Sequence, residues 1–209
     1  MKIGIYGGTF NPPHKGHLHM AQAFLETVQP DTMLVIPNKR PVHKICEDLA
    51  LDEERLALCR LAFSAPQFTV SAMEIESDKP SFTLYTIEAL RQTYPDAELC
   101  LLVGSDMFLS FHKWYHYKDI LNEVTLYVAS REGQVSKQDL RSYAFQKLGL
   151  YLRGEPNEKV QILPIEPLEV SSSLLRERLC HGKSTDDFLA PQVLDYIKEH
   201  HMYGYREKC

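Results

Sequence analysis

The sequence contains no run of about 18 apolar residues, and this lack excludes a membrane-spanning helix of the usual length. Its first residues, MKIGIYGG, reach glycine too early to form the hydrophobic region of a secretion signal. The five cysteines are an odd number, widely scattered, and none forms a CxxC pair. We therefore expect neither a disulfide framework nor a cysteine zinc site, and we expect a soluble, cytoplasmic protein that does not bind membranes.

The sequence also lacks an excess of basic residues. The 23 Lys and Arg are outnumbered by 28 Asp and Glu, which gives a formal net charge of −5. Such a chain is a poor candidate for holding a nucleic acid by bulk charge, although a local cluster can still bind a few phosphates. The length of 209 residues suits one domain with a sizeable core, so we expect a single domain over residues 1–209. The sequence leaves open whether the chain forms a homo-oligomer.

Short runs of branched residues alternate with amphipathic stretches along the chain, which is typical of an α/β fold. We expect a Rossmann-like open parallel sheet with helices on both faces. The expected strands are Lys2–Tyr6, Thr32–Ile36, Phe68–Ala72, Leu99–Val103, Thr125–Ala129 and Gln161–Leu163. The expected helices are Gly16–Thr27, Asp52–Phe63, Thr83–Tyr94, Gln138–Leu148, Ser173–Cys180 and Pro191–His201. In the second helix, the charged residues Glu53, Glu54, Arg55 and Arg60 are expected to face solvent.

The stretch IYGGTFNPPHKGH, residues 5–17, joins the first expected strand to the first expected helix. Gly7 and Gly8 let the backbone approach a ligand closely, and the amides at a helix start attract an anion. Neither the GxGxxG nor the GxxxxGK[ST] phosphate-binding pattern is present. Instead, His14 and His17 fall on one side of the first helical turn, where each can donate a ring N–H to a phosphate oxygen.

Two other roles for this histidine pair stay open at this point. The spacing suits zinc, but no third or fourth ligand stands nearby at motif spacing, so we expect no metal-ligating residues. Single histidines are also often ordinary hydrogen-bonded groups without a ligand. The neighbouring glycine turn favours the phosphate role over both.

A second stretch, EVSSSLLRERL at residues 169–179, has a similar composition at a helix start. Three serines immediately precede the expected helix, and Arg176 lies one turn into it. Helix capping accounts for one serine but not for three together with Arg176. Two such helix starts, each after a strand, predict a crevice that binds a ligand with several phosphates, and a nucleoside triphosphate fits.

Together, GGTFNPPHKGH and VSSSLLR resemble the HxGH and SSTxxR signatures of the nucleotidyltransferase superfamily, which are highly specific as a pair. Within it, four further segments are similar to those of bacterial nicotinate-nucleotide adenylyltransferases: NKRPVHK (38–44), KPSFTLYT (79–86), LLVGSDM (101–107) and HKWYHY (112–117). The resemblance covers residues 2–203. Phe82, Tyr85 and Ser173 depart from the family pattern, which usually has Tyr, Asp and Thr at these positions.

The resemblance implies a reaction in NAD biosynthesis. The adenylyl group of ATP would pass to nicotinate mononucleotide, forming nicotinate adenine dinucleotide (deamido-NAD) and pyrophosphate. Mg²⁺ would accompany ATP and share the neutralisation of charge, and neither a covalent enzyme intermediate nor a general base is needed.

The resemblance also implies roles for individual residues. The catalytic residues would be His17 on the α-phosphoryl group, His14 on the triphosphate, and Arg176. The further ATP contacts would be Gly8, Thr9 and Phe10 through the backbone, Gly104 and Asp106 on adenosine, and Ser172 on the β and γ phosphates. The contacts to nicotinate mononucleotide would be Lys44, Thr83, Trp114 and Tyr115, with the Trp114 ring on the pyridine. Lys44 also fits an exposed loop lysine, and a lone tryptophan also fits a core position.

Two other functions stay open. A pantetheine-phosphate adenylyltransferase shares both phosphate motifs, but its chain is shorter and lacks the PSFT and KW segments. A catalytically silent nucleotide sensor would have the same fold, but His14, His17 and Arg176 are all present here.

Overall fold

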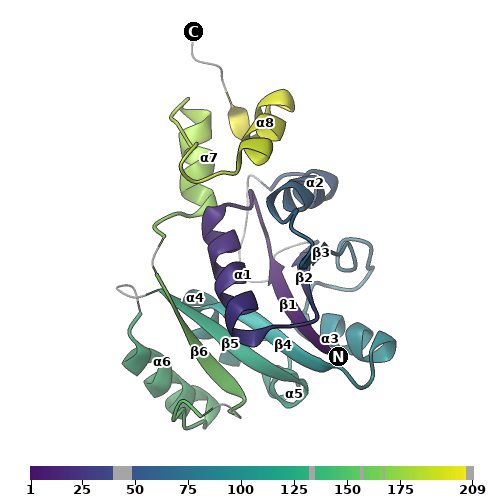
Figure 1. Cartoon of the computed structure of the whole chain (residues 1–209), viewed down its shortest axis with the longest axis vertical. Coiled ribbons are helices and arrows are strands. Elements are labelled where there is room, and N and C mark those ends of the chain that lie inside the picture. Colours follow the sequence, from purple (N-terminus) through teal and green to yellow (C-terminus); the bar gives the residue numbers. More distant parts are fainter. Residues whose placement is uncertain (40–48, 132–134, 156–157, 167, 206–209) are drawn as a thin grey trace.

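Six parallel strands form one sheet at the centre of the computed structural model, in the order β3-β2-β1-β4-β5-β6 (Figure 1). The structure describes residues 1–39, 49–131, 135–155, 158–166 and 168–205. The strands are β1 (Lys2–Gly8), β2 (Thr32–Pro37), β3 (Phe68–Val70), β4 (Glu98–Gly104), β5 (Val124–Arg131) and β6 (Val160–Ile165). The chain builds outward from β1 to β3 and then returns to add β4 on the other side, so the strand order reverses between β1 and β4.

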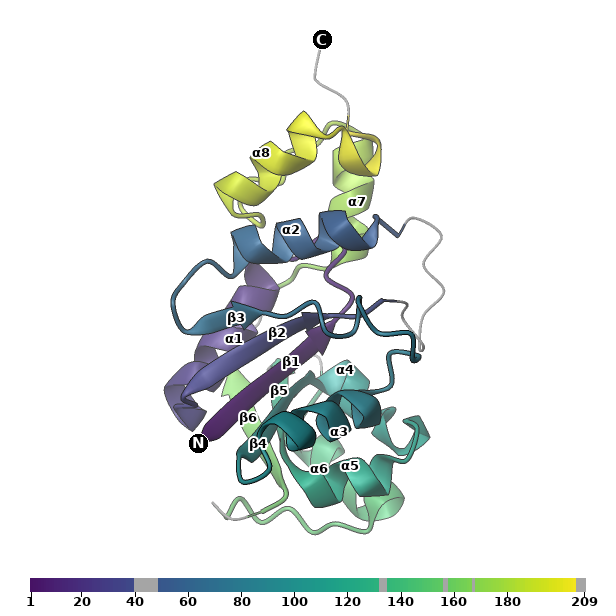
Figure 2. The same ribbon diagram turned by 90° about the vertical axis from the view of Figure 1, so that its right-hand side faces the viewer.

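Helices cover both faces of this sheet (Figure 2). They are α1 (Lys15–Val28), α2 (Asp52–Ala62), α3 (Thr83–Thr93), α4 (Ser105–Phe108), η1 (Phe111–Lys113), α5 (Tyr117–Glu123), α6 (Lys137–Tyr143), η2 (Ala144–Leu148), α7 (Ser172–Cys180), α8 (Pro191–Glu199) and η3 (Met202–Gly204). Helices α3 to α6 share one buried core with the sheet, and α1 and α2 share a second core on the other face. A third core joins α7 and α8 to the outer side of α2. No helix in the described part of the chain is long and apolar enough to cross a membrane.

Strands β1 and β4 separate toward their carboxyl ends. β1 pairs with β2 along its length to Gly8, but its pairing with β4 runs only from Lys2 to Ile5. Ligands of open α/β sheets bind outside the carboxyl ends of the strands, at the point where the strand order reverses. The fold therefore opens a crevice between Gly8 and Gly104.

The sequence predicted the six strands and the parallel sheet, and the structure confirms both. It missed the short helices α4, η1 and α5 between β4 and β5. Each has seven residues or fewer, which is too short to show a helical period in the sequence. The expected helix Gln138–Leu148 is α6 followed by a single π-helical turn, η2.

The prediction that Arg55 faces solvent is wrong. Its side chain is fully buried, although it lies on the charged side of α2. The guanidinium donates to three backbone carbonyls, those of Thr9 (2.9 Å), Lys39 (3.2 Å) and Ala50 (3.3 Å), and it pairs with Asp52. Arg55 thus joins the loop after β1 to the chain after β2 and to the start of α2.

We expect Arg55→Ala to lower the free energy of unfolding by about 3 kcal/mol or more. The change leaves three carbonyls without their donor, and a buried polar group that loses its partner costs about 1–3 kcal/mol. Arg60 on the same helix is exposed, so Arg60→Ala is the matched control with an expected change within about 0.5 kcal/mol. Urea denaturation of both variants measures the difference. Equal losses would show that the burial of Arg55 contributes nothing to stability.

Candidate active site

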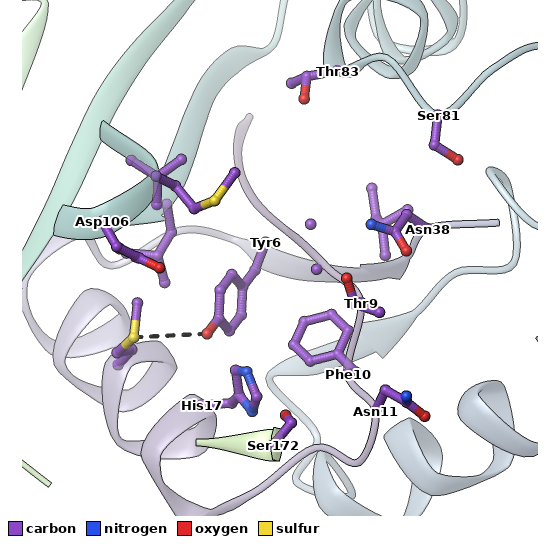
Figure 3. A pocket seen from close by; sticks show the side chains of 18 of the residues that line it. Tyr6, Thr9, Phe10, Asn11, His17, Asn38, Ser81, Thr83, Asp106 and Ser172 are labelled. Atoms are coloured by element: carbon purple, nitrogen blue, oxygen red, sulfur yellow. Dashed lines mark hydrogen bonds between the residues drawn. The ribbon is translucent and has the colours of Figure 1, made fainter. Parts of the chain in front are cut away.

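A cavity of about 370 Å³ lies in the crevice between β1 and β4. Most of the predicted site residues line it: Gly8, Thr9, Phe10, His14, His17, Thr83, Gly104, Asp106, Trp114, Ser172 and Arg176. Figure 3 shows His17 and Ser172 close together on one side of the cavity, and Ser81 and Thr83 on the opposite side. The cavity therefore has two chemically different ends.

The two histidines form a reciprocal cap at the start of α1. The Nδ1 atom of His14 accepts from the backbone N–H of His17 (3.3 Å), and Nδ1 of His17 accepts from that of His14 (3.2 Å). The rings stack with their centroids 3.7 Å apart. A histidine takes here the place that Ser, Thr, Asp or Asn usually fill at an N-cap.

The two capping bonds assign a tautomer to each neutral ring. A ring nitrogen that accepts a hydrogen bond carries no proton, so each neutral imidazole has its proton on Nε2. Protonating either ring at Nδ1 would break a capping bond. His14 and His17 are thereby held as paired Nε2–H donors at a helix N-terminus that lines the cavity, and both features favour an anion.

The loop between β1 and α1 brings its backbone to the cavity. Phe10 adopts the left-handed conformation (φ 47°), and its buried ring lies over Gly8, where an added Cβ would come within 2.9 Å of it. At Gly7 an added Cβ would meet no atom within 4 Å. Gly8 is thus required by the Phe10 ring, whereas Gly7 leaves open space for the close approach of a ligand.

The start of α7 completes this end of the cavity. Ser171 is the N-cap and accepts from the N–H of Leu174 (3.2 Å), whereas the Ser172 hydroxyl donates to the carbonyl of Pro12 (2.9 Å). The donor that Ser172 offers to an anion is therefore its backbone N–H rather than its hydroxyl.

Arg176 lines the same end and is fixed in orientation. Its NH1 donates to the carbonyl of Asn11 (3.0 Å), while its buried Nε has no hydrogen-bond partner among the residues that the structure describes. A buried donor without a partner is costly, which makes this Nε–H a candidate donor to an anion in the cavity.

Gly104 and Asp106 lie at the carboxyl end of β4. An added Cβ at Gly104 would come within 2.7 Å of the Asp106 carboxylate, so glycine leaves the room that this side chain occupies. Asp106 is exposed at the cavity wall, where a carboxylate can accept from a ribose hydroxyl. Within the described ranges, no group of three or more His, Cys, Asp or Glu could hold a metal ion.

The opposite end of the cavity contains polar residues that sequence reasoning missed. Glu74 accepts from the hydroxyl of Thr86 (2.6 Å), and burial raises the pKa of its carboxyl above the usual value. Ser81 accepts from the N–H of Lys39 (3.0 Å). The Oδ1 atom of Asn38 is buried without a donor among the described residues. Asn38 and Ser81 lie in two of the segments that carry the family resemblance, but no role followed for them from the sequence, and Glu74 lies in none of these segments.

Thr83 begins α3, whose N-cap Phe82 makes no side-chain capping bond. The first turn contains no acidic residue, so its amides and dipole are left to attract an anion. Trp114 lines the cavity as expected and packs on Phe111 (centroids 4.9 Å apart).

Tyr115 is an expected contact whose side chain does not line the cavity. The side chain is 41% exposed and its ring stacks on Phe82. The contact expected of Tyr115 is through its backbone amide, which this placement of the ring leaves as a prediction. Lys44 lies outside the residues that the structure describes.

Comparisons with known proteins agree with this geometry. Residues 5–178 match the Cytidylyltransferase-like protein family. The chain is 33% identical over 203 residues to the nicotinate-nucleotide adenylyltransferase of Bacillus subtilis (strain 168), covering 97% of this chain and 98% of that relative. Two solved structures of the Plasmodium falciparum nicotinic acid mononucleotide adenylyltransferase, complexed with APC and with NaAD, are similar in fold. Each is 17% identical to this chain, with a TM-score of 0.76 and coverage of 98% of both chains.

Proposed function

The chain belongs to the family of nicotinate-nucleotide adenylyltransferases, and we propose that it joins the adenylyl group of ATP to nicotinate mononucleotide in NAD biosynthesis. The products are nicotinate adenine dinucleotide and pyrophosphate. The observation that carries this proposal is that two helix starts line one end of a single cavity. The start of α1 contributes His14 and His17, and the start of α7 contributes Arg176. Donors from two helices at one place suit a triphosphate.

The reaction is a direct displacement at phosphorus. A 5′-phosphate oxygen of the mononucleotide forms a bond to the α-phosphorus of ATP, and the bond from that phosphorus to the β-phosphate bridging oxygen breaks. A phosphate is already a nucleophile at pH 7, so the protein needs only to align the two substrates and to stabilise the charge that develops. The Nε2–H donors of His17 and His14 are proposed to do this at the α-phosphoryl group and the triphosphate.

Mg²⁺ fits this site as a companion of ATP. Magnesium in phosphoryl-transfer sites is usually bound by substrate phosphates and one or two carboxylates rather than by a cage of protein ligands. The described residues offer no cluster of metal ligands, so the triphosphate of ATP would supply most of the oxygens that hold the metal. When bound, the metal would shield the charge on the pyrophosphate as it leaves.

The two ends of the cavity suggest how the substrates divide it. Gly104 and Asp106 are proposed to contact adenosine, and Gly8, Thr9 and Phe10 to contact ATP through the backbone. Thr83 and Trp114 are proposed to bind the nicotinate part of the acceptor, and Lys44 to bind its phosphate. Gly7 also lines the cavity, and the open space beside it leaves room for a substrate to approach the backbone.

We expect Arg176→Lys to raise the KM for ATP about tenfold. Lysine keeps the positive charge but lacks the planar guanidinium donors. The Nε–H of Arg176, which has no partner among the described residues and is proposed to bind the triphosphate, is lost in this variant. Arg178 lies on the same helix, donates to the Ser184 carbonyl and does not line the cavity, so Arg178→Lys is the control. Steady-state kinetics with varied ATP compare the two. An unchanged KM in Arg176→Lys would remove Arg176 from the triphosphate site.

The function is tested by incubating the protein with ATP, Mg²⁺ and a panel of acceptors, and by measuring pyrophosphate release. Nicotinate mononucleotide is expected to be the preferred acceptor. Release with phosphopantetheine would instead assign the pantetheine-phosphate reaction. Binding of ATP without release, with any acceptor, would indicate a nucleotide sensor.

A cytoplasmic location is also part of the proposal. Cys59, Cys100 and Cys180 are free thiols in the structure. Free thiols are usual in the cytosol, where glutathione and thioredoxin keep them reduced.

A further inference from the structure

Two neighbouring segments supply Thr83 and Trp114 to the acceptor end of the cavity. Thr83 stands at the start of α3, and Trp114 follows the short helix η1. The chain neighbour of each, Phe82 and Tyr115, does not line the cavity. Instead, these two rings stack on each other, with centroids 4.7 Å apart and an interplanar angle of 20°.

A third ring supports this stack. Tyr85 lies one turn into α3 and contacts both rings, with centroid distances of 5.9 Å to Phe82 and 5.8 Å to Tyr115. The ammonium of Lys79 lies 4.9 Å from the centre of the Tyr85 ring. We call Phe82, Tyr85 and Tyr115 the aromatic clasp, because they join α3 to the segment that carries Trp114.

The two segments are also joined at the far end of α3. There Arg91 donates to the carboxylate of Glu123 (2.8 Å) and to its backbone carbonyl (3.0 Å), which ties α3 to the end of α5. Between its two ends, α3 packs in the core that it shares with α5 and the Trp114 segment. At the N-terminal end of α3, the aromatic clasp joins the chain neighbours of Thr83 and Trp114 directly.

The Trp114 segment has a separate support on its other side. The hydroxyl of Tyr143 on α6 accepts from the N–H of His112 (2.9 Å) and contacts the ring Nδ1 of His112 (2.8 Å). This bond fixes the segment to α6 but not to α3. Loss of the clasp is therefore expected to change the distance across the acceptor end while leaving the segment folded.

We propose that Phe82 and Tyr115 are positioning residues: their stack sets the spacing between the α3 N-terminus and the Trp114 ring, and thereby the affinity for a flat aromatic acid. This inference rests on the proposed function, which makes nicotinate mononucleotide the acceptor. It explains why Tyr115 is turned away from the cavity next to a residue that lines it. The clasp acts on acceptor binding and leaves the phosphate-binding end unchanged, because its three rings lie outside the cavity wall.

The test compares Tyr115→Ala and Phe82→Ala with Tyr115→Phe. Each alanine variant is expected to raise the KM for nicotinate mononucleotide about three- to tenfold, the range for losing one aromatic pair, with the KM for ATP within about twofold of wild type. Because the two rings act as one contact, the double variant is expected to show no larger increase than the worse single variant. Tyr115→Phe keeps the ring and is expected to retain the wild-type KM.

A second readout uses Trp114, which is the only tryptophan of the chain. Its fluorescence anisotropy without substrate is expected to fall in Tyr115→Ala, because the indole loses the support of its segment. Tyr151→Ala is the matched control: Tyr151 is 69% exposed, its ring contacts that of Phe145 (centroids 4.6 Å apart), and it does not line the cavity. It is expected to change neither the KM nor the anisotropy.

The outcomes separate the two proposals. If wild-type protein does not use nicotinate mononucleotide, the proposed function fails, whereas a fall in Trp114 anisotropy in Tyr115→Ala still supports the positioning role. If the anisotropy and the acceptor KM both stay at wild-type values, the clasp proposal is overturned. It is also overturned if Tyr115→Ala raises the KM for ATP as much as that for the acceptor, since that result indicates a general loss of structure.

Discussion

Replacing His17 by alanine is expected to lower kcat by at least about 10²-fold while changing the KM for ATP much less. The charge on the α-phosphoryl oxygens grows as the reaction proceeds, so a preorganised donor aimed there stabilises the transition state more than the bound substrate. Loss of one such donor costs roughly 3 kcal/mol. We propose the Nε2–H of His17 as this donor, because the Nδ1 atom of the same ring accepts the capping bond.

The same substitution also removes half of the reciprocal cap on α1. Loss of an N-cap costs about 0.5–2 kcal/mol, so the variant is expected to be less stable but folded. Kinetics measured well below its unfolding temperature separate the two effects. His19→Ala is the control, because His19 is on the same helix and outside the cavity wall. A His17→Ala enzyme with near-normal kcat would contradict the assignment to the α-phosphoryl group.

The sequence was sufficient to predict which residues line the phosphate-binding end of the cavity, because short local motifs mark that end. A glycine turn after a strand, histidines in a first helical turn and serines before a helix are patterns whose meaning depends on a few consecutive residues. The structure confirms that His14, His17 and Arg176 line one cavity. The motifs lie about 160 residues apart, and the parallel sheet brings them together.

The residues that sequence reasoning missed depend on long-range contacts. Arg55 fits an exposed position on an amphipathic helix, and only the packing of two loops over α2 buries it. Glu74 lies in a segment without regular structure and gains its role from Thr86, twelve residues later. The stack of the Tyr115 ring on Phe82 likewise joins residues that are 33 positions apart, and no local pattern predicts it.

The acceptor end carries the second large expected effect, a preference for the acid over the amide. The first-turn amides of α3 at Thr83 are donors only, and the turn has no acidic residue or side-chain cap. A carboxylate accepts on both oxygens and gains from the helix dipole. A carboxamide must turn its NH₂ toward a donor on one side, which leaves buried groups unpaired at a cost of about 1–3 kcal/mol each.

Glu74 is the group that opposes this preference, since its carboxyl lies beside Thr86, one turn further along α3. Its effect is limited in two ways: its oxygen is engaged by the Thr86 hydroxyl, and burial raises its pKa, which favours the neutral form as the pH falls. The ionised fraction of Glu74 therefore weakens the preference for the acid, and more so at higher pH.

We accordingly expect nicotinate mononucleotide to be preferred over nicotinamide mononucleotide by at least about 10²-fold in kcat/KM. This is the discrimination expected when the amide substrate leaves one or two buried groups of the site unpaired. Glu74→Gln, which removes the opposing charge but keeps an acceptor for Thr86, is expected to maintain or increase the ratio. Thr83→Ala is expected to change it little, because the donors belong to the backbone. Competition between the two mononucleotides at one ATP concentration measures the ratio. Equal use of both would indicate a dual-specificity enzyme, and a preference for the amide would show that the α3 N-terminus does not bind the acceptor.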